Sequence, residues 1–172
     1  MTMMDYIISD YITGKAVRNV GPEAVRQDFE RFLVDEKGYD REDIRVDERL
    51  VVQFKGEDYP SSIDLIVFCH DTAFMAITCV AGSIGSYERE ILAGARLVYD
   101  YRIPLAVSTD ARDAVILDTL SGKNVGRGLS AVPSKAEALE RMKTMEFMPF
   151  DENRKEREMI IYRSFNLEKI NK

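Results

Sequence analysis

The sequence predicts a mixed α/β fold, in which helices flank a central β-sheet of mixed strand direction. Two observations support this prediction. Residues 63–69 and 74–80 are dense in β-branched and aromatic side chains, as central strands are. Helical patterns of apolar residues lie on both sides of these strands, and alternation of helices and strands along a chain is typical of an α/β architecture.

The N-terminal half is predicted to contain two helices before the first strand. Residues 3–12 are expected to form a short helix. A longer helix starts at Pro22, because proline at the first helical position lacks only an N–H that would be unpaired there, and Gly38 ends it. Residues 44–54 are then expected to form a strand, and residues 55–58 a turn.

Turn and capping residues set the elements of the second half. The loop at residues 82–86 leads into a long helix, with Ser86 as the expected N-cap. Ser134 and Glu137 have the spacing of a capping box, which predicts another helix start. The remaining expected elements are two strands and two helices, at residues 105–108, 114–117, about 136–145 and from 151 onward.

Length and composition suit a soluble protein. The 172 residues fit one domain at 1–150 and a helical extension at 151–172. Hydrophobic residues make up 45% and charged residues 31%. The sequence shows no apolar run near the ~20 residues that span a membrane, and no basic region precedes the apolar residues at the N-terminus. We therefore expect a cytoplasmic protein with no membrane partner.

The charge balance and the metal-binding residue types exclude some functions. A net charge of −6 and a pI of about 5.0 argue against tight, nonspecific nucleic-acid binding, although a local basic patch or a metal-bridged contact stays open. Cys69 and Cys79 lie in predicted strands and are expected to be small buried hydrophobes. His70 is the one histidine and falls in a predicted turn, so no zinc spacing exists.

Four stretches, taken in order, resemble a known family. They are Glu23-Ala24-Val25-Arg26 at a helix start, Ser62-Ile63-Asp64-Leu65-Ile66-Val67 in a strand, Glu88-Arg89-Glu90-Ile91 opening the long helix, and Ile103-Pro104-Leu105-Ala106-Val107-Ser108-Thr109-Asp110 in a later strand. With this order, residues 17–133 resemble the N-terminal nuclease domain of type I restriction enzyme R subunits, of the PD-(D/E)xK superfamily. The resemblance implies a restriction-endonuclease-like core with extra terminal helices.

The resemblance implies a specific chemistry and shows a departure from it. In that superfamily two carboxylates on neighbouring strands hold Mg²⁺, and a lysine two residues after the second acid stabilises developing charge. Asp64 matches the first carboxylate. The positions of the second acid and the lysine hold Thr78 and Val80, which share a strand face but cannot supply that chemistry.

The missing groups could come from elsewhere in the chain. Glu88 and Glu90, in the first turn of the long helix, are candidates to join Asp64 as catalytic residues. Asp64 and Glu88 are candidates to hold Mg²⁺ or Mn²⁺. The alternatives are structural: first-turn acids interact favourably with the helix dipole, and Asp64 could pair with an arginine.

Candidate contacts to nucleic acid are weaker. Arg26, Arg89 and Lys123 could contact phosphates or replace the missing cation, but each is better explained as an ordinary surface residue. The loop at 82–86 could hold a phosphate with backbone N–H groups, yet it lacks the lysine and spacing of a P-loop. A simple strand-to-helix connection is the alternative.

Three functions remain open from the sequence. One is an active nuclease with migrated catalytic groups around Asp64, dependent on Mg²⁺ or Mn²⁺. Another is a nuclease-like domain that no longer cuts and that binds nucleic acid, with DNA as one candidate, or a protein partner. A third is a homo-oligomer that assembles through the C-terminal helix. From the sequence alone we favour the second, because the acid and the lysine are absent from the second strand.

Overall fold

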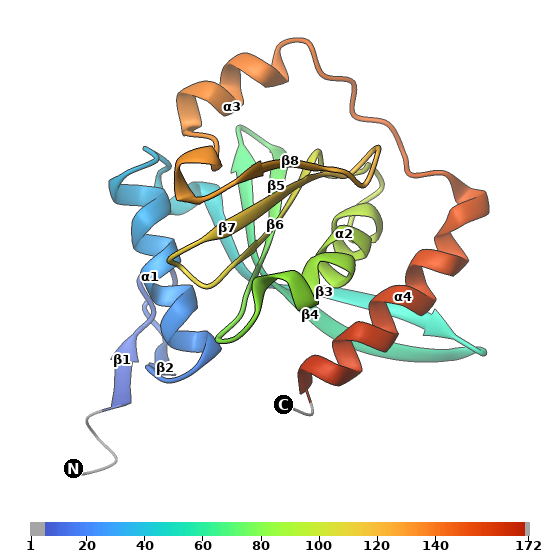
Figure 1. Ribbon diagram of the computed structural model, residues 1–172, viewed down its shortest axis with the longest axis horizontal. Coiled ribbons are helices and arrows are strands. Elements are labelled where there is room, and N and C mark those ends of the chain that lie inside the picture. Colours follow the sequence, from blue (N-terminus) through green and yellow to red (C-terminus); the bar gives the residue numbers. More distant parts are fainter. Residues whose placement is uncertain (1–5, 171–172) are drawn as a thin grey trace.

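The six-stranded sheet lies between two pairs of helices, as Figure 1 shows. The computed structural model describes residues 6–170, apart from the side chains of residues 168 and 170. The strand order is β3-β4-β5-β6-β7-β8. Helices α1 and α3 pack on one face of the sheet, and α2 and α4 pack on the other. The predicted mixed α/β fold is therefore confirmed.

The sheet is mixed because one of its neighbour pairs is parallel. Strand β5 runs parallel to β6, and every other neighbouring pair is antiparallel. Helix α2 makes the connection that a parallel pair requires. The strands are β3 Ile44–Phe54, β4 Glu57–Cys69, β5 Thr72–Cys79, β6 Leu105–Thr109, β7 Ala114–Asp118 and β8 Asn124–Arg127.

In the described part of the chain, four α-helices and three short 3₁₀ turns accompany the six-stranded sheet. The helices are α1 Pro22–Asp35, α2 Glu88–Leu97, α3 Lys135–Met142 and α4 Glu152–Ile170. The 3₁₀ turns are η2 Arg41–Asp43, η3 Ile84–Tyr87 and η4 Leu129–Ala131. Proline opens α1 as predicted, and the hydroxyl of Ser134 accepts a hydrogen bond from the N–H of Glu137 at the start of α3.

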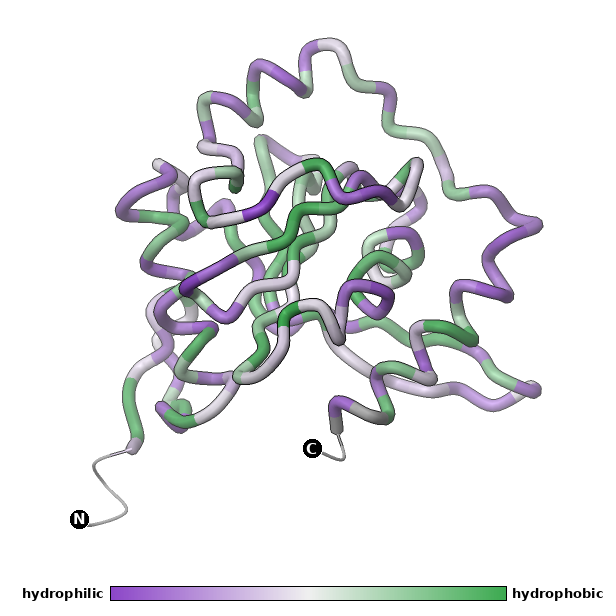
Figure 2. Tube along the Cα trace, in the orientation of Figure 1, coloured by the Kyte–Doolittle hydropathy of each residue, from purple (hydrophilic) through white to green (hydrophobic). Residues whose placement is uncertain are grey.

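Each face of the sheet carries its own hydrophobic core. Figure 2 shows the apolar residues gathered on the central strands, with polar residues frequent along α3 and α4. Along β4, Leu65 and Val67 face the helices α1 and α3, whereas Ile66 faces α2. Ile63 also faces α2, although it lies two residues from Leu65. The alternation expected of a strand therefore breaks at Asp64.

The N-terminal helix prediction is wrong. The segment forms a two-stranded antiparallel hairpin, β1 Ile7–Ser9 and β2 Ala16–Arg18. The carboxylate of Asp10 accepts the N–H groups of the residues two and three positions later, and Gly14 takes a positive φ of 74°. This turn chemistry outweighs a weak helical preference. Residues 3–5 of the predicted helix lie outside the described residues.

Two smaller expectations also need correction. Ser86 is not an N-cap, because it lies inside η3, and α2 starts after Tyr87 without a side-chain cap. Strand β8 was not predicted, since its short polar sequence lacks strand periodicity. Cys69 and Cys79 are buried and form no disulfide, as expected. None of the helices within residues 6–170 is long and apolar enough to cross a membrane.

Candidate functional site

Four elements bring polar side chains together at one end of the central strands. The ammonium of Lys169, on α4, lies 3.2 Å from Oδ2 of Asp64 on β4, and 3.3 Å from Oε1 of Glu90 on α2. It also donates to Oγ1 of Thr78 on β5 at 2.6 Å. We call Asp64, Thr78, Glu90 and Lys169 the Asp64 cluster. It unites two acids and one lysine from distant parts of the chain.

The break in β4 presents the carboxylate of Asp64 to this cluster. Pairing between β4 and β5 runs only to Leu65 and Ile77. Beyond it, the N–H of Cys79 donates to Oδ2 of Asp64 at 2.7 Å, so a side chain takes the place of a strand carbonyl. The Asp64 side chain is 22% exposed. Among residues 6–170, its Oδ1 accepts no hydrogen bond, which leaves one carboxylate oxygen facing outward.

Glu90 is the buried acid of the cluster. Its side chain is 4% exposed. Oε2 accepts a hydrogen bond from Nδ2 of Asn166 at 3.2 Å, while Oδ1 of Asn166 accepts from the hydroxyls of Tyr59 and Ser61. Burial raises the pKa of Glu90, and the attraction of Lys169 and the Asn166 hydrogen bond oppose that rise. The carboxylate is thus held in one orientation toward Lys169.

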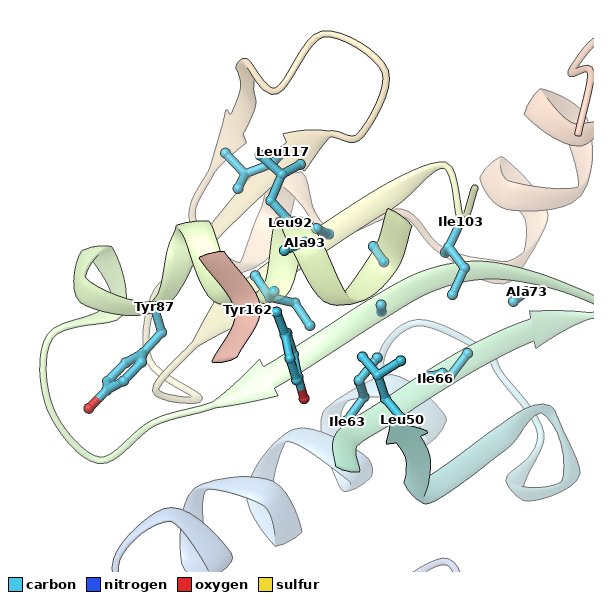
Figure 3. Packing of buried hydrophobic residues seen from close by; sticks show 14 of the residues in the cluster. Leu50, Ile63, Ile66, Ala73, Tyr87, Leu92, Ala93, Ile103, Leu117 and Tyr162 are labelled. Carbon is cyan, nitrogen blue, oxygen red and sulfur yellow. The ribbon is translucent and has the colours of Figure 1, made fainter. Parts of the chain in front are cut away.

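Helix α4 places Lys169 through one polar face. Glu158, Tyr162 and Asn166 recur every four residues, and Lys169 follows three residues later, so all four lie on the same side of the helix. Glu158 forms a buried ion pair with Arg96 of α2 at 2.9 Å. Figure 3 shows Tyr162 between α2 and the strands, beside Ile63.

The close approach of α4 to α2 depends on a small residue. A Cβ at Gly94 would lie 3.3 Å from both the Tyr162 ring and the Ile63 side chain. Glycine at this position therefore lets Tyr162 sit against α2. This contact helps to set the position of α4 relative to α2 and the sheet, and therefore the position of Lys169.

Lys169 keeps its proton in this environment. Burial lowers the pKa of Lys169, but the attraction of Asp64 and Glu90 outweighs burial and raises the pKa above its ordinary value. The side chain is therefore an ammonium at neutral pH. It can donate hydrogen bonds and stabilise negative charge, and it is not a general base.

Two hollows adjoin the cluster, and Lys169 lines both. The first has a volume of about 320 Å³ and is formed mainly by the loop after β5, with Pro22 and Tyr87. The second has a volume of about 590 Å³ and is lined by Asp64 and by polar residues of β3 and β4 such as Arg49. A ligand at Lys169 can therefore extend to either side.

The structure brings together two of the three predicted catalytic residues. Asp64 and Glu90 share Lys169. Glu88 is half-buried at the start of α2 and forms no hydrogen bond or ion pair with Asp64, Thr78 or Lys169. Its catalytic and metal-binding roles stay predictions. The partner of Asp64 proves to be a lysine rather than an arginine.

The predicted nucleic-acid contacts lie in different settings. The Arg26 side chain is 7% exposed and forms ion pairs with Asp10, Glu23 and Asp47, so its charge is committed inside the protein. Arg89 and Lys123 are exposed. The role of all three at phosphates stays a prediction.

The cluster offers few protein ligands to a metal. Within residues 6–170, no group of three or more His, Cys, Asp or Glu side chains could hold a metal ion. Asp64 and Glu90 supply two carboxylates. Mg²⁺ is commonly bound by one or two carboxylates, with water and substrate phosphate completing its octahedron. The two carboxylates therefore fit a Mg²⁺ or Mn²⁺ site whose other ligands are water and substrate phosphate, and not a site made of protein ligands alone.

Sequence reasoning missed Lys169. It lies 105 residues after Asp64 and outside the stretch that resembles the nuclease domain. A signal was present in α4, where Glu158, Asn166 and Lys169 fall on one helix face together with Tyr162. A stripe of polar residues along one face of a helix that also carries apolar residues indicates a buried polar contact.

The comparison with protein families assigns the chain. A family model described as the type I restriction enzyme R protein N terminus matches residues 21–133. This match covers more than half of the chain, and the chain therefore belongs to that family. Comparisons with curated proteins and with solved structures gave no match.

Proposed function

We propose that this domain is a metal-dependent phosphodiesterase that acts on nucleic acid, with Asp64, Glu90 and Lys169 as its catalytic residues. The observation that carries the proposal is that both acids contact the ammonium of Lys169. The sequence pattern lacks an acid and a lysine on β5. In the structure α2 supplies an acid, Glu90, and α4 supplies a lysine, Lys169. The family to which the chain belongs supports DNA as the substrate.

The charges of the cluster match what the reaction needs. The nuclease superfamily uses two carboxylates and one ammonium. Here the second carboxylate lies on α2 and the ammonium on α4, instead of on the second strand. A bound Mg²⁺ or Mn²⁺ would polarise the phosphate and lower the pKa of the attacking water. The outward oxygen of Asp64 and the carboxylate of Glu90 are the groups that would hold it.

The residues of this chain have separate tasks in the reaction. Lys169 donates hydrogen bonds to a phosphate oxygen, where negative charge grows in the transition state. Thr78 and the N–H of Cys79 hold Lys169 and Asp64 in place, which is the positioning that a phosphoryl transfer requires. Asn166 fixes the orientation of Glu90.

A cleavage time course on single- and double-stranded DNA and RNA, with Mg²⁺ or Mn²⁺, tests the proposal. Loss of one charge-stabilising donor typically costs about 10²–10³ in rate. We expect Lys169→Met, Glu90→Gln and Asp64→Ala each to lose at least about 100-fold. Lys155→Met is the matched control, because Lys155 lies on the same helix in an exposed pair with Glu152.

The Glu88→Gln variant decides which acid of α2 is used. If Glu90 is the second acid, Glu88→Gln cleaves at a rate close to that of the wild type. A large loss in Glu88→Gln with normal rates in Glu90→Gln would move the role to Glu88. Unchanged cleavage in Lys169→Met would refute the proposed role of the ammonium.

A second candidate function is binding without cleavage. It is favoured by the hydrogen bonds of Lys169 to both acids, which satisfy the carboxylates with protein groups alone, and by Thr78 and Val80 on β5. In that case the wild type cleaves no substrate with any divalent metal. Affinity for DNA would still fall with added salt if phosphates are contacted, and salt-independent binding would point to a protein partner or to self-association through α4.

A further inference from the structure

The smaller hollow beside the Asp64 cluster has the character of a ligand pocket. Its walls are largely apolar, and Lys169 closes one side. We call it the Tyr87 pocket, lined by Pro22, Val80, Ala81, Ser83, Ser86 and Tyr87. Ligand sites are typically apolar hollows with a few convergent polar groups. The same lysine therefore serves both the proposed reaction centre and this pocket.

Three hydroxyls of the pocket form no hydrogen bond within residues 6–170. Tyr87 is only 8% exposed, yet its hydroxyl makes no hydrogen bond with residues 6–170. The hydroxyls of Ser83 and Ser86 likewise have no partner in that part of the chain. Figure 3 shows the Tyr87 hydroxyl pointing away from Leu92 and Ala93 of the core. Hydroxyls that can donate or accept are thus available to a ligand.

The volume of the pocket suits a single nucleotide base. A volume of about 320 Å³ is at the small end of ligand pockets. A base inside a duplex is covered by its neighbours above and below and is paired along its edge, so it cannot enter such a hollow unless it is first unpaired. A base of a single strand has both its faces and its edge free.

We propose that the Tyr87 pocket binds the base of one unpaired nucleotide whose phosphate lies at Lys169, so that the substrate is single-stranded nucleic acid. The proposal rests on the function assigned to the Asp64 cluster and names its substrate class. The apolar wall contacts the base, and the hydroxyls of Tyr87, Ser83 and Ser86 meet its polar edge. The neighbouring nucleotides of the strand lie along the larger hollow, beside Asp64 and Arg49.

Binding without cleavage tests the pocket apart from the reaction. Fluorescence anisotropy would follow a labelled oligothymidylate, and a blunt duplex of the same length, in Ca²⁺. Gly82 also lines the pocket. A Cβ there meets no atom within 4 Å and the φ is not positive, so the backbone tolerates a side chain, and Gly82→Phe adds a ring beside the pocket. We expect Gly82→Phe to weaken single-strand binding about tenfold or more.

Two further variants complete the series. Tyr87→Phe removes only the hydroxyl and is expected to weaken binding about 2- to 10-fold, the range of one hydrogen bond. Ser130→Phe places the same ring on the exposed turn η4 and is expected to bind as the wild type does. Thermal unfolding of each variant shows whether the fold is intact.

The outcomes separate this inference from the proposed function. Single-strand binding that is weakened by Gly82→Phe supports the pocket even if no cleavage is ever seen. Equal binding by Gly82→Phe and the wild type, or tighter binding of the duplex, overturns it and leaves the cleavage test untouched. A free nucleoside monophosphate that competes as well as the strand would overturn the assignment to nucleic acid.

Discussion

The buried ion pair between Arg96 and Glu158 is predicted to hold α4 on α2. The two side chains are 3% and 5% exposed, and the guanidinium Nη1 lies 2.9 Å from the carboxylate. Arg96 also donates from Nε to the carbonyl of Thr119 at 2.8 Å. Glu158→Met keeps the length of the side chain and removes its charge, so Arg96 stays buried without a counter-ion.

The expected loss can be worked out from this geometry. Removing one partner of a buried pair costs about 3–5 kcal/mol. The remaining hydrogen bond to Thr119 satisfies part of the guanidinium, so we expect the lower end, about 3 kcal/mol. For a chain of this length each kcal/mol shifts the Tm by about 2–4 °C, which predicts a fall of roughly 6–12 °C.

Calorimetry and circular dichroism would measure the Tm of Glu158→Met. Glu152→Gln is the control, because its exposed pair with Lys155 on the same helix is worth at most about 1 kcal/mol. The double variant Arg96→Met/Glu158→Met is expected to recover most of the loss, since an apolar pair replaces two charges. A Glu158→Met loss no larger than that of Glu152→Gln would refute the reasoning.

Two further predictions concern buried titratable groups. Burial, together with the nearby charge of Asp10, raises the pKa of Glu30 from 4.5 to about 8. Between these pH values the folded state keeps a proton that the unfolded state releases. The free energy of unfolding therefore falls as the pH rises through this range. Glu30→Gln should remove that part of the decline in urea unfolding between about pH 5 and pH 8, and an identical slope in both proteins would contradict it. Burial also raises the pKa of Cys69 to about 11 and that of Cys79 well above its ordinary value, so a thiol reagent should label neither in the native protein, whereas rapid labelling before unfolding would contradict their burial.

Strong local signals made much of the fold predictable. The strand at residues 44–54 and the start of α1 at Pro22 are found where the sequence places them. The short strands β1, β2 and β8 were not predicted, because three or four residues carry too little periodicity and are set by their pairing partners. The fold class followed from the long strands and helices, which are the elements with readable patterns.

The candidate site was predictable only in part, for a different reason. Asp64 stood out as an acid in an apolar strand, and Glu90 followed from its place in the first turn of α2. Lys169 could not be placed, because the helical pattern of α4 does not specify which element its polar face meets. The position of α4 depends on the packing of Tyr162 against Gly94 and on the Arg96–Glu158 ion pair, which are tertiary contacts.

The dependence of the cluster on α4 has a consequence for the order of synthesis. Every strand of the sheet leaves the ribosome before Lys169 does, so a nascent chain can fold its sheet while Asp64 and Glu90 still lack their cation. Two unneutralised acids would then face each other beside the growing core. We expect the proposed centre to assemble last, as α4 docks, which delays any reaction until synthesis has passed residue 169.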